Sequence, residues 1–150
     1  MAKAKITRIL TLADGSEQGF RGAAQAIALA KVCEARLTVI SVIDTETLRQ
    51  LLTFRILASQ EMSDFEGELE VSARQYLDRV RSMAMDDKVV AEQVLVKGPY
   101  HTAVLAQVRQ TGADLLVIPG FKSRDATRDL LAREYQKILD DAPCPVMVVK

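Results

Sequence analysis

The sequence predicts an α/β fold in which an open, mostly parallel sheet of five strands carries helices on both faces. First, short runs of aliphatic and β-branched residues alternate with longer stretches of helical periodicity along the chain. Second, the run LTVISVI at 37–43 is nearly all apolar, as in strands buried on both faces of a parallel sheet. Third, the 150 residues contain no linker or low-complexity tract, which predicts a single domain over 1–150.

The composition argues against several classes of protein. Hydrophobic residues make up 49% of the chain and charged residues 27%, a mixture typical of globular domains. Basic and acidic residues number 20 each, so the net charge is zero and no nucleic-acid partner is expected. One His and two separated cysteines, Cys33 and Cys144, predict no metal site and two buried thiols. The start MAKAKITRIL lacks a signal-peptide core and no apolar run approaches the about 20 residues of a membrane span, so we expect a cytoplasmic protein without membrane contact.

The first strand is expected at 6–13, where it runs into the turn sequence Asp14-Gly15-Ser16. A helix over 17–35 follows, and Ser16 is placed to cap its N-terminus. Its small apolar residues share one face, which predicts close packing on the sheet: Ala23, Ala26, Ile27, Ala30 and Cys33. The second strand is the apolar run at 37–43.

The interval from 44 to 84 is the longest between strands. Its leucines and Ile56 predict a short first helix. The capping-box sequence Ser63-Asp64-Phe65-Glu66 predicts a break at 60–63 and the start of a long second helix that reaches about Met83. The third strand is expected at 89–96, and its polar pair Glu92-Gln93 indicates a position near a sheet edge.

The rest of the chain keeps the same alternation. Pro99 suits the first turn of a helix that Gly112 ends. The remaining elements are a strand at 115–118, a helix at about 125–140 and a strand at 146–149. Ligands of such sheets bind beyond the carboxyl ends of the strands, where the strand order reverses. The loops at 14–16 and 120–123 are therefore the candidate site.

Three stretches, ILTLADGSE, GADLLVIPG and DDAPCPVMVV, resemble the motifs of the universal stress protein family in both type and order. The resemblance covers essentially the whole chain. It implies an adenine-nucleotide-hydrolase-like fold with strand order 3-2-1-4-5. It also implies a homodimer that forms through the last strand.

The resemblance weakens at the segment where some family members bind ATP. Those members carry Gly-x-x-Gly, nine residues, and then Gly-Ser or Gly-Thr. Here Gly120 matches the first glycine, but the next position is Ser123, and the later pair becomes Ala132 and Arg133 after only eight residues. A non-glycine residue at positive φ costs about 1–2 kcal/mol, so these changes predict a loss of about a hundredfold or more in ATP affinity. We therefore expect no tightly bound ATP and no other cofactor.

Two interpretations of this segment stay open. Basic residues there could hold a phosphate or another small anion by charge instead of by a backbone cradle: Lys122, Arg124, Arg128 and Arg133. Acidic residues are interleaved with them, and an ordinary solvated face with local ion pairs explains the same pattern: Asp125, Asp129 and Glu134.

Asp14 and Val42 each have two possible interpretations. By the family resemblance, Asp14 lies beside a nucleotide, where ribose or a metal contacts it. The alternative is that its side chain shapes the turn, as Asp often does. Val42 offers backbone groups to an adenine by the same resemblance, and otherwise is an ordinary strand valine.

The last strand is the candidate dimer interface. Its valines, Val146, Val148 and Val149, are expected at a sheet edge, where pairing with a second copy would satisfy free backbone groups. No GxSxG, HExxH or GxxxxGK[ST] sequence occurs, and His101 has no assigned nucleophile, so no catalytic residue is expected. We therefore expect a stress-response protein that acts by dimerisation and by binding unknown protein partners. The alternatives are an adenine-nucleotide sensor or slow ATPase, and a small-anion or metabolite-binding module.

Overall fold

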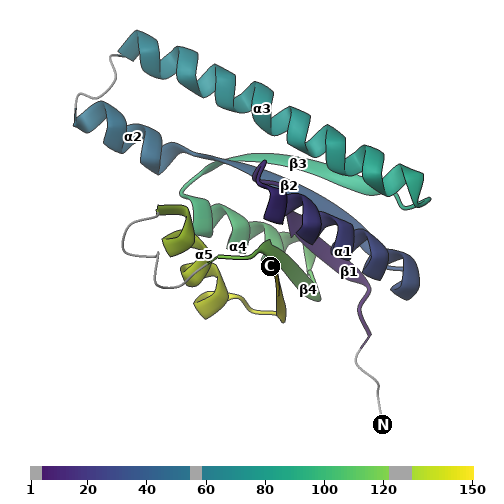
Figure 1. Cartoon of the computed structure of the whole chain (residues 1–150). Coiled ribbons are helices and arrows are strands. Elements are labelled where there is room, and N and C mark those ends of the chain that lie inside the picture. Colours follow the sequence, from purple (N-terminus) through teal and green to yellow (C-terminus); the bar gives the residue numbers. More distant parts are fainter. Residues whose placement is uncertain (1–4, 55–58, 122–129) are drawn as a thin grey trace.

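The computed structural model describes residues 5–54, 59–121 and 130–150, and it contains one five-stranded parallel sheet (Figure 1). The order along the sheet is β3-β2-β1-β4-β5, as the family resemblance implied. The strands are β1 (Arg8–Leu12), β2 (Arg36–Asp44), β3 (Ala91–Gly98), β4 (Leu115–Pro119) and β5 (Val146–Val149). The order reverses between β1 and β4, so the crevice between their carboxyl ends is where a ligand is expected.

Helices cover both faces of the sheet, which confirms the predicted architecture. One face packs on α1 (Glu17–Cys33) and α3 (Ser59–Asp86), and the other packs on α4 (Tyr100–Thr111) and α5 (Leu130–Asp141). Neighbouring strand residues alternate between the two cores, so that Ile9 lies in one and Leu10 in the other. Each fully buried aliphatic side chain stabilises the fold by about 1.5–3 kcal/mol, which explains why the strands are apolar on both faces.

The first helix begins and ends as its sequence predicts. The Ser16 hydroxyl accepts a 2.9 Å hydrogen bond from the Gly19 N–H. The helix ends at Cys33, slightly before the predicted end, because Glu34 adopts a left-handed conformation at φ 55°. The expectation of two buried thiols is wrong, because both Cys33 and Cys144 are only half-buried.

The predicted break at 60–63 is also wrong. Helix α2 (Thr45–Thr53) starts directly after β2, with the Asp44 carboxylate accepting from the N–H groups of Glu46 and Thr47. Helix α3 already begins at Ser59, so the capping-box sequence lies inside it. There Asp64 accepts a side-chain hydrogen bond from Gln60, a pairing of residues four apart that favours the helix interior.

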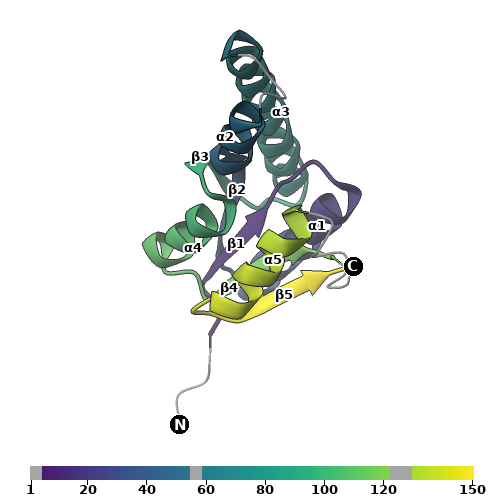
Figure 2. The same cartoon turned by 90° about the vertical axis from the view of Figure 1, so that its left-hand side faces the viewer.

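Helix α2 and the first half of α3 form an arm that projects beyond the carboxyl ends of the strands, while the second half of α3 packs on the sheet (Figures 1 and 2). The first half of α3 therefore overhangs the edge where a ligand is expected. The arm carries exposed aromatic side chains, and Phe54 is 72% exposed.

The remaining elements match their predictions with shifted ends. Strand β3 starts at Ala91 and forms one edge of the sheet, as the Glu92-Gln93 pair indicated. Helix α5 is described from Leu130, so its predicted start at Asp125 lies outside the described residues. Over the three described ranges, no helix combines the length and the apolar character that crossing a bilayer requires.

Candidate functional site

Two cavities lie side by side at the carboxyl edge of the sheet. Their volumes are about 510 and 550 Å³, within the range of small-molecule sites. Asp14, which follows β1, lines both of them, and so does Leu131 on α5. The cleft is thus divided into two compartments that share a wall.

The first compartment, here called the α3 cavity, lies beneath the arm. Its floor is formed by the ends of β1 and β2, with Ser41, Val42 and Asp44. Its roof is the apolar stripe of α3, formed by Phe65, Leu69, Ala73 and Tyr76. Its described lining includes Asp14 and Asp44 but no Lys or Arg, so its electrostatics disfavour a phosphate group.

The second compartment, here called the β4 cavity, lies between β4 and α5. Pro119, Gly120 and Phe121 line one side. Ala132 and Tyr135 line the α5 side, and Lys150 supplies the basic side chain among the described lining residues.

Asp14 uses both carboxylate oxygens within the protein. Its Oδ1 accepts from the Ser16 N–H at 2.9 Å and from the Ser16 hydroxyl at 2.6 Å. Its Oδ2 accepts from the Tyr135 hydroxyl at 2.6 Å. A Cβ on Gly19 would lie 2.3 Å from Oδ1, so the helix approaches the carboxylate closely. In this structure Asp14 therefore shapes the turn and holds α5, and its contact to a ligand stays a prediction.

Tyr135 belongs to a buried aromatic cluster. Its hydroxyl lies 3.4 Å from that of Tyr100, and the two rings meet edge to face with centroids 5.8 Å apart. Burial, together with the nearby Asp14 carboxylate, raises the pKa of both phenols well above the ordinary value. Tyr135 is therefore protonated at neutral pH and can donate its proton to Asp14.

Gly120 has a different structural role from the one expected. Its N–H donates to the Val149 carbonyl at 2.6 Å, and an added Cβ would lie 2.8 Å from the Lys150 Cα. Its φ angle lies outside the left-handed region. Gly120 is thus required by the close approach of β5, and its N–H is not turned toward the β4 cavity to cradle a phosphate.

Of the other predicted site residues, some line the cleft and some do not. Val42 lines the α3 cavity with Asp14. Arg133 is exposed on α5 and lines neither cavity. Lys122 and Ser123 lie outside the described residues. The valines of the predicted dimer interface, Val146, Val148 and Val149, lie on β5 at the edge of the sheet and are half-buried.

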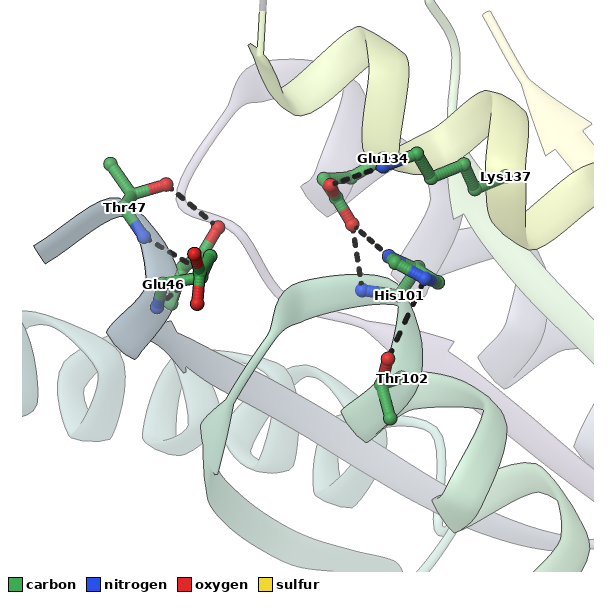
Figure 3. A network of polar contacts seen from close by, with 7 residues as sticks. Glu46, Thr47, His101, Thr102, Glu134 and Lys137 are labelled. Atoms are coloured by element: carbon green, nitrogen blue, oxygen red, sulfur yellow. Dashed lines mark hydrogen bonds and ion pairs between the residues drawn. The ribbon is translucent and has the colours of Figure 1, made fainter. Parts of the chain in front are cut away.

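A second polar cluster ties α4 to α5 beside the cleft. His101 and Glu134 point toward each other, with Nδ1 of His101 2.5 Å from Oε2 of Glu134 (Figure 3). Burial alone would raise the pKa of Glu134, but hydrogen bonds and charge from His101, with the Lys137 ammonium, lower that pKa below its usual range. His101 is thus a partnered residue of the helix interface, not a free surface histidine.

Sequence reasoning missed Tyr100 and Tyr135 as residues of the site, and it named Glu134 only as one of the interleaved acidic residues. Tyr135 lies on the buried face of α5 and is 3% exposed. Nothing in the sequence paired its hydroxyl with Asp14, because that contact depends on how α5 packs over the end of β1.

A doubly wound sheet of this order, with a divided cleft at its carboxyl edge, defines a domain of the nucleotide-binding-like α/β class. The family model for "Universal stress protein family" matches residues 5–150, and the chain belongs to that family.

Individual relatives match over almost the full chain. A universal stress protein of Thermus aquaticus is 29% identical over 150 residues, covering 95% of this chain and 97% of its own. The structure of universal stress protein UspA from Lactobacillus plantarum has a TM-score of 0.75 at 20% identity, covering 99% of this chain and 100% of its own. The structure of a universal stress protein from Archaeoglobus fulgidus in complex with dAMP has a TM-score of 0.63 at 17% identity, covering 99% of this chain and 100% of its own.

Proposed function

We propose that this protein is a cytoplasmic stress-response regulator that works as a homodimer through protein partners, and that its cleft does not hold ATP tightly. The observation that carries this proposal is the buried ring of Tyr135, whose hydroxyl donates a 2.6 Å hydrogen bond to Asp14 and which lies beside the cleft. A ribose hydroxyl or a metal ion at Oδ2 of Asp14 would have to share this oxygen with the Tyr135 phenol, whose ring stays in place beside it.

Two further features support weak ATP binding. The Gly120 N–H already donates to Val149, so it offers no hydrogen bond to a phosphate oxygen. The α3 cavity carries two acidic side chains, Asp14 and Asp44, which repel a triphosphate that enters from this side. Among the described lining of the β4 cavity, Lys150 supplies one basic side chain, which by itself does not offset several phosphate charges.

Thermal unfolding with millimolar ATP and Mg²⁺ tests this proposal. A ligand present at a hundredfold excess over its Kd stabilises the folded state by about 2.7 kcal/mol. We expect no shift in the unfolding temperature. A clear shift that Asp14→Ala abolishes would overturn the proposal in favour of an ATP sensor.

The second candidate function is recognition of an adenine nucleoside or nucleoside monophosphate in the α3 cavity. The cavity has the right size, at about 510 Å³, and combines the edge of β2 at Val42 with the aromatic walls of Phe65 and Tyr76. The Archaeoglobus fulgidus relative in complex with dAMP provides a precedent for such a ligand in this family. Calorimetric titration with adenosine and with AMP tests it, and Val42→Pro, which removes the backbone N–H, is expected to abolish the heat of binding.

Dimerisation is proposed through β5. In the sheet as described, β5 pairs with β4 alone, so its other edge has backbone groups available to a second copy. Antiparallel pairing would also cover the half-buried valines.

A further inference from the structure

We infer that Tyr135 partitions the cleft and thereby determines which nucleotides it accepts, an inference that rests on the proposed weak binding of ATP. Its ring lines the β4 cavity and its hydroxyl bonds to Asp14, the residue at which this cavity adjoins the α3 cavity. The α3 cavity alone has room for a nucleoside, whereas a nucleoside triphosphate needs both compartments.

The lining residues locate the partition. Tyr100 lines the α3 cavity, Tyr135 lines the β4 cavity, and Asp14 lines both. The hydroxyls of the two tyrosines lie 3.4 Å apart, and that of Tyr135 lies 2.6 Å from Asp14. These three side chains therefore form a continuous wall, with one tyrosine facing each compartment.

The wall is rigid because neighbouring rings hold it. Tyr135 is 3% exposed, and its ring contacts those of Tyr100 and Phe121, each with centroids 5.8 Å apart. Turning Tyr135 aside would break the hydrogen bond to Asp14 and leave a part-buried carboxylate oxygen without that donor. A ligand therefore meets a closed partition instead of a side chain that gives way.

The chemistry of each compartment fits this division. The α3 cavity offers apolar and aromatic walls and two carboxylates, which suit a base or a sugar that donates hydrogen bonds. The β4 cavity has Ser16, Gln18 and Lys150 among its lining residues, which are the groups that could contact phosphate oxygens. Among the described residues, Asp14 and Leu131 line both compartments, so phosphates attached to a nucleoside in the first compartment would pass beside Tyr135 to reach these groups.

The test measures the binding of adenosine, AMP, ADP and ATP to the wild type and to three Tyr135 variants by isothermal titration calorimetry. Tyr135→Leu withdraws the side chain from Asp14 while keeping an apolar residue in the core, and Tyr135→Ala opens the passage fully. We expect both variants to bind ATP and ADP at least about tenfold more tightly than the wild type, with the larger gain for Tyr135→Ala. Adenosine binding is expected to change by less than about threefold.

Tyr135→Phe is the matched control, because it removes the hydroxyl but keeps the ring. We expect it to bind ATP as weakly as the wild type. A gain in ATP affinity equal to that of Tyr135→Leu would overturn the partition and show that the freed Asp14 oxygen decides binding. No gain in Tyr135→Leu, when circular dichroism shows that it is folded, would also overturn it. Tight ATP binding by the wild type would instead refute the proposed function itself.

Discussion

The hydroxyl of Tyr135 donates a 2.6 Å hydrogen bond to Oδ2 of Asp14, which joins α5 to the turn after β1 across 121 residues of sequence. The same carboxylate holds the Ser16 side chain, and Ser16 caps α1. One acidic residue thus fixes two helices at the edge of the sheet where the cleft lies. The Tyr135 ring that this bond holds beside Asp14 is the main reason to expect that the cleft differs from one that binds a triphosphate.

The Tyr135→Phe substitution is expected to destabilise the fold. It deletes a buried hydrogen bond to a charged acceptor, which contributes about 1.5–3 kcal/mol in other proteins. Urea unfolding measures the change, with Tyr76→Phe as the control. The Tyr76 ring packs near Gly15, and its hydroxyl makes no described hydrogen bond. Removing the Tyr76 hydroxyl is therefore expected to lower the free energy of unfolding by less than about 0.5 kcal/mol. Equal effects of the two substitutions would contradict a stabilising role for the bond.

Two glycines in helices are expected to respond in opposite ways to alanine. A Cβ at Gly19 would lie 2.3 Å from Oδ1 of Asp14, so Gly19→Ala must displace the carboxylate or the helix. We expect it to destabilise the protein by about 1–3 kcal/mol. A Cβ at Gly67 would meet nothing within 4 Å, and Gly67→Ala is expected to stabilise α3 by about 0.5–1 kcal/mol. The unfolding temperatures of both variants test these two expectations. Stabilisation by Gly19→Ala would show that Asp14 is not held as described.

Stability is expected to fall steeply in alkaline solution. Burial raises the pKa of Tyr100 and Tyr135 above the ordinary value of 10.0 in the folded state. Between that value and the higher folded pKa, the unfolded chain loses protons that the folded chain keeps, so stability decreases as the pH rises. In this pH range, each phenol lowers the free energy of unfolding by about 1.4 kcal/mol per pH unit.

Urea unfolding at a series of pH values above 9 measures this slope, with the pH range chosen from the ordinary phenol pKa. The variant Tyr135→Phe is expected to show about half of the wild-type pH slope, because it lacks one of the two phenols. A slope that the variant leaves unchanged would mean that Tyr135 ionises as readily in the folded protein as in the unfolded chain.

If the protein dimerises through β5, a charged side chain on this strand is expected to weaken the dimer. Val148 is half-buried on the last strand, and an Asp there would place a carboxylate in the interface of two antiparallel edges. Light scattering is expected to give a dimer for the wild type at tens of micromolar and a monomer for Val148→Asp. A wild-type monomer at that concentration would refute pairing through this edge.

The fold was predictable because each element has a local signal. The apolar run at 37–43 indicated a buried parallel strand, and the polar pair Glu92-Gln93 indicated an edge, and both were correct. The helix break was misplaced because Ser63-Asp64-Phe65-Glu66 fits a helix start and a helix interior equally well. Such a pattern predicts a boundary only where the preceding residues cannot be helical.

The site was predictable only in part. Asp14, Val42 and Gly120 follow or end strands, and topology alone places them at the cleft. Arg133 was grouped with them by its place in a motif, but successive helix residues point about 100° apart, and its neighbours Ala132 and Tyr135 face the cavity instead. The role of Gly120 depends on its distance to Val149 and Lys150, which no local pattern encodes.

Thermal unfolding of the wild type with and without millimolar ATP and Mg²⁺ tests the central claim most directly. If the Tyr135 ring beside Asp14 and the occupied Gly120 N–H leave no place for a triphosphate, the two unfolding temperatures will coincide. A rise of roughly 5 °C or more, the size expected for a hundredfold excess over Kd in a domain of this length, would contradict the account.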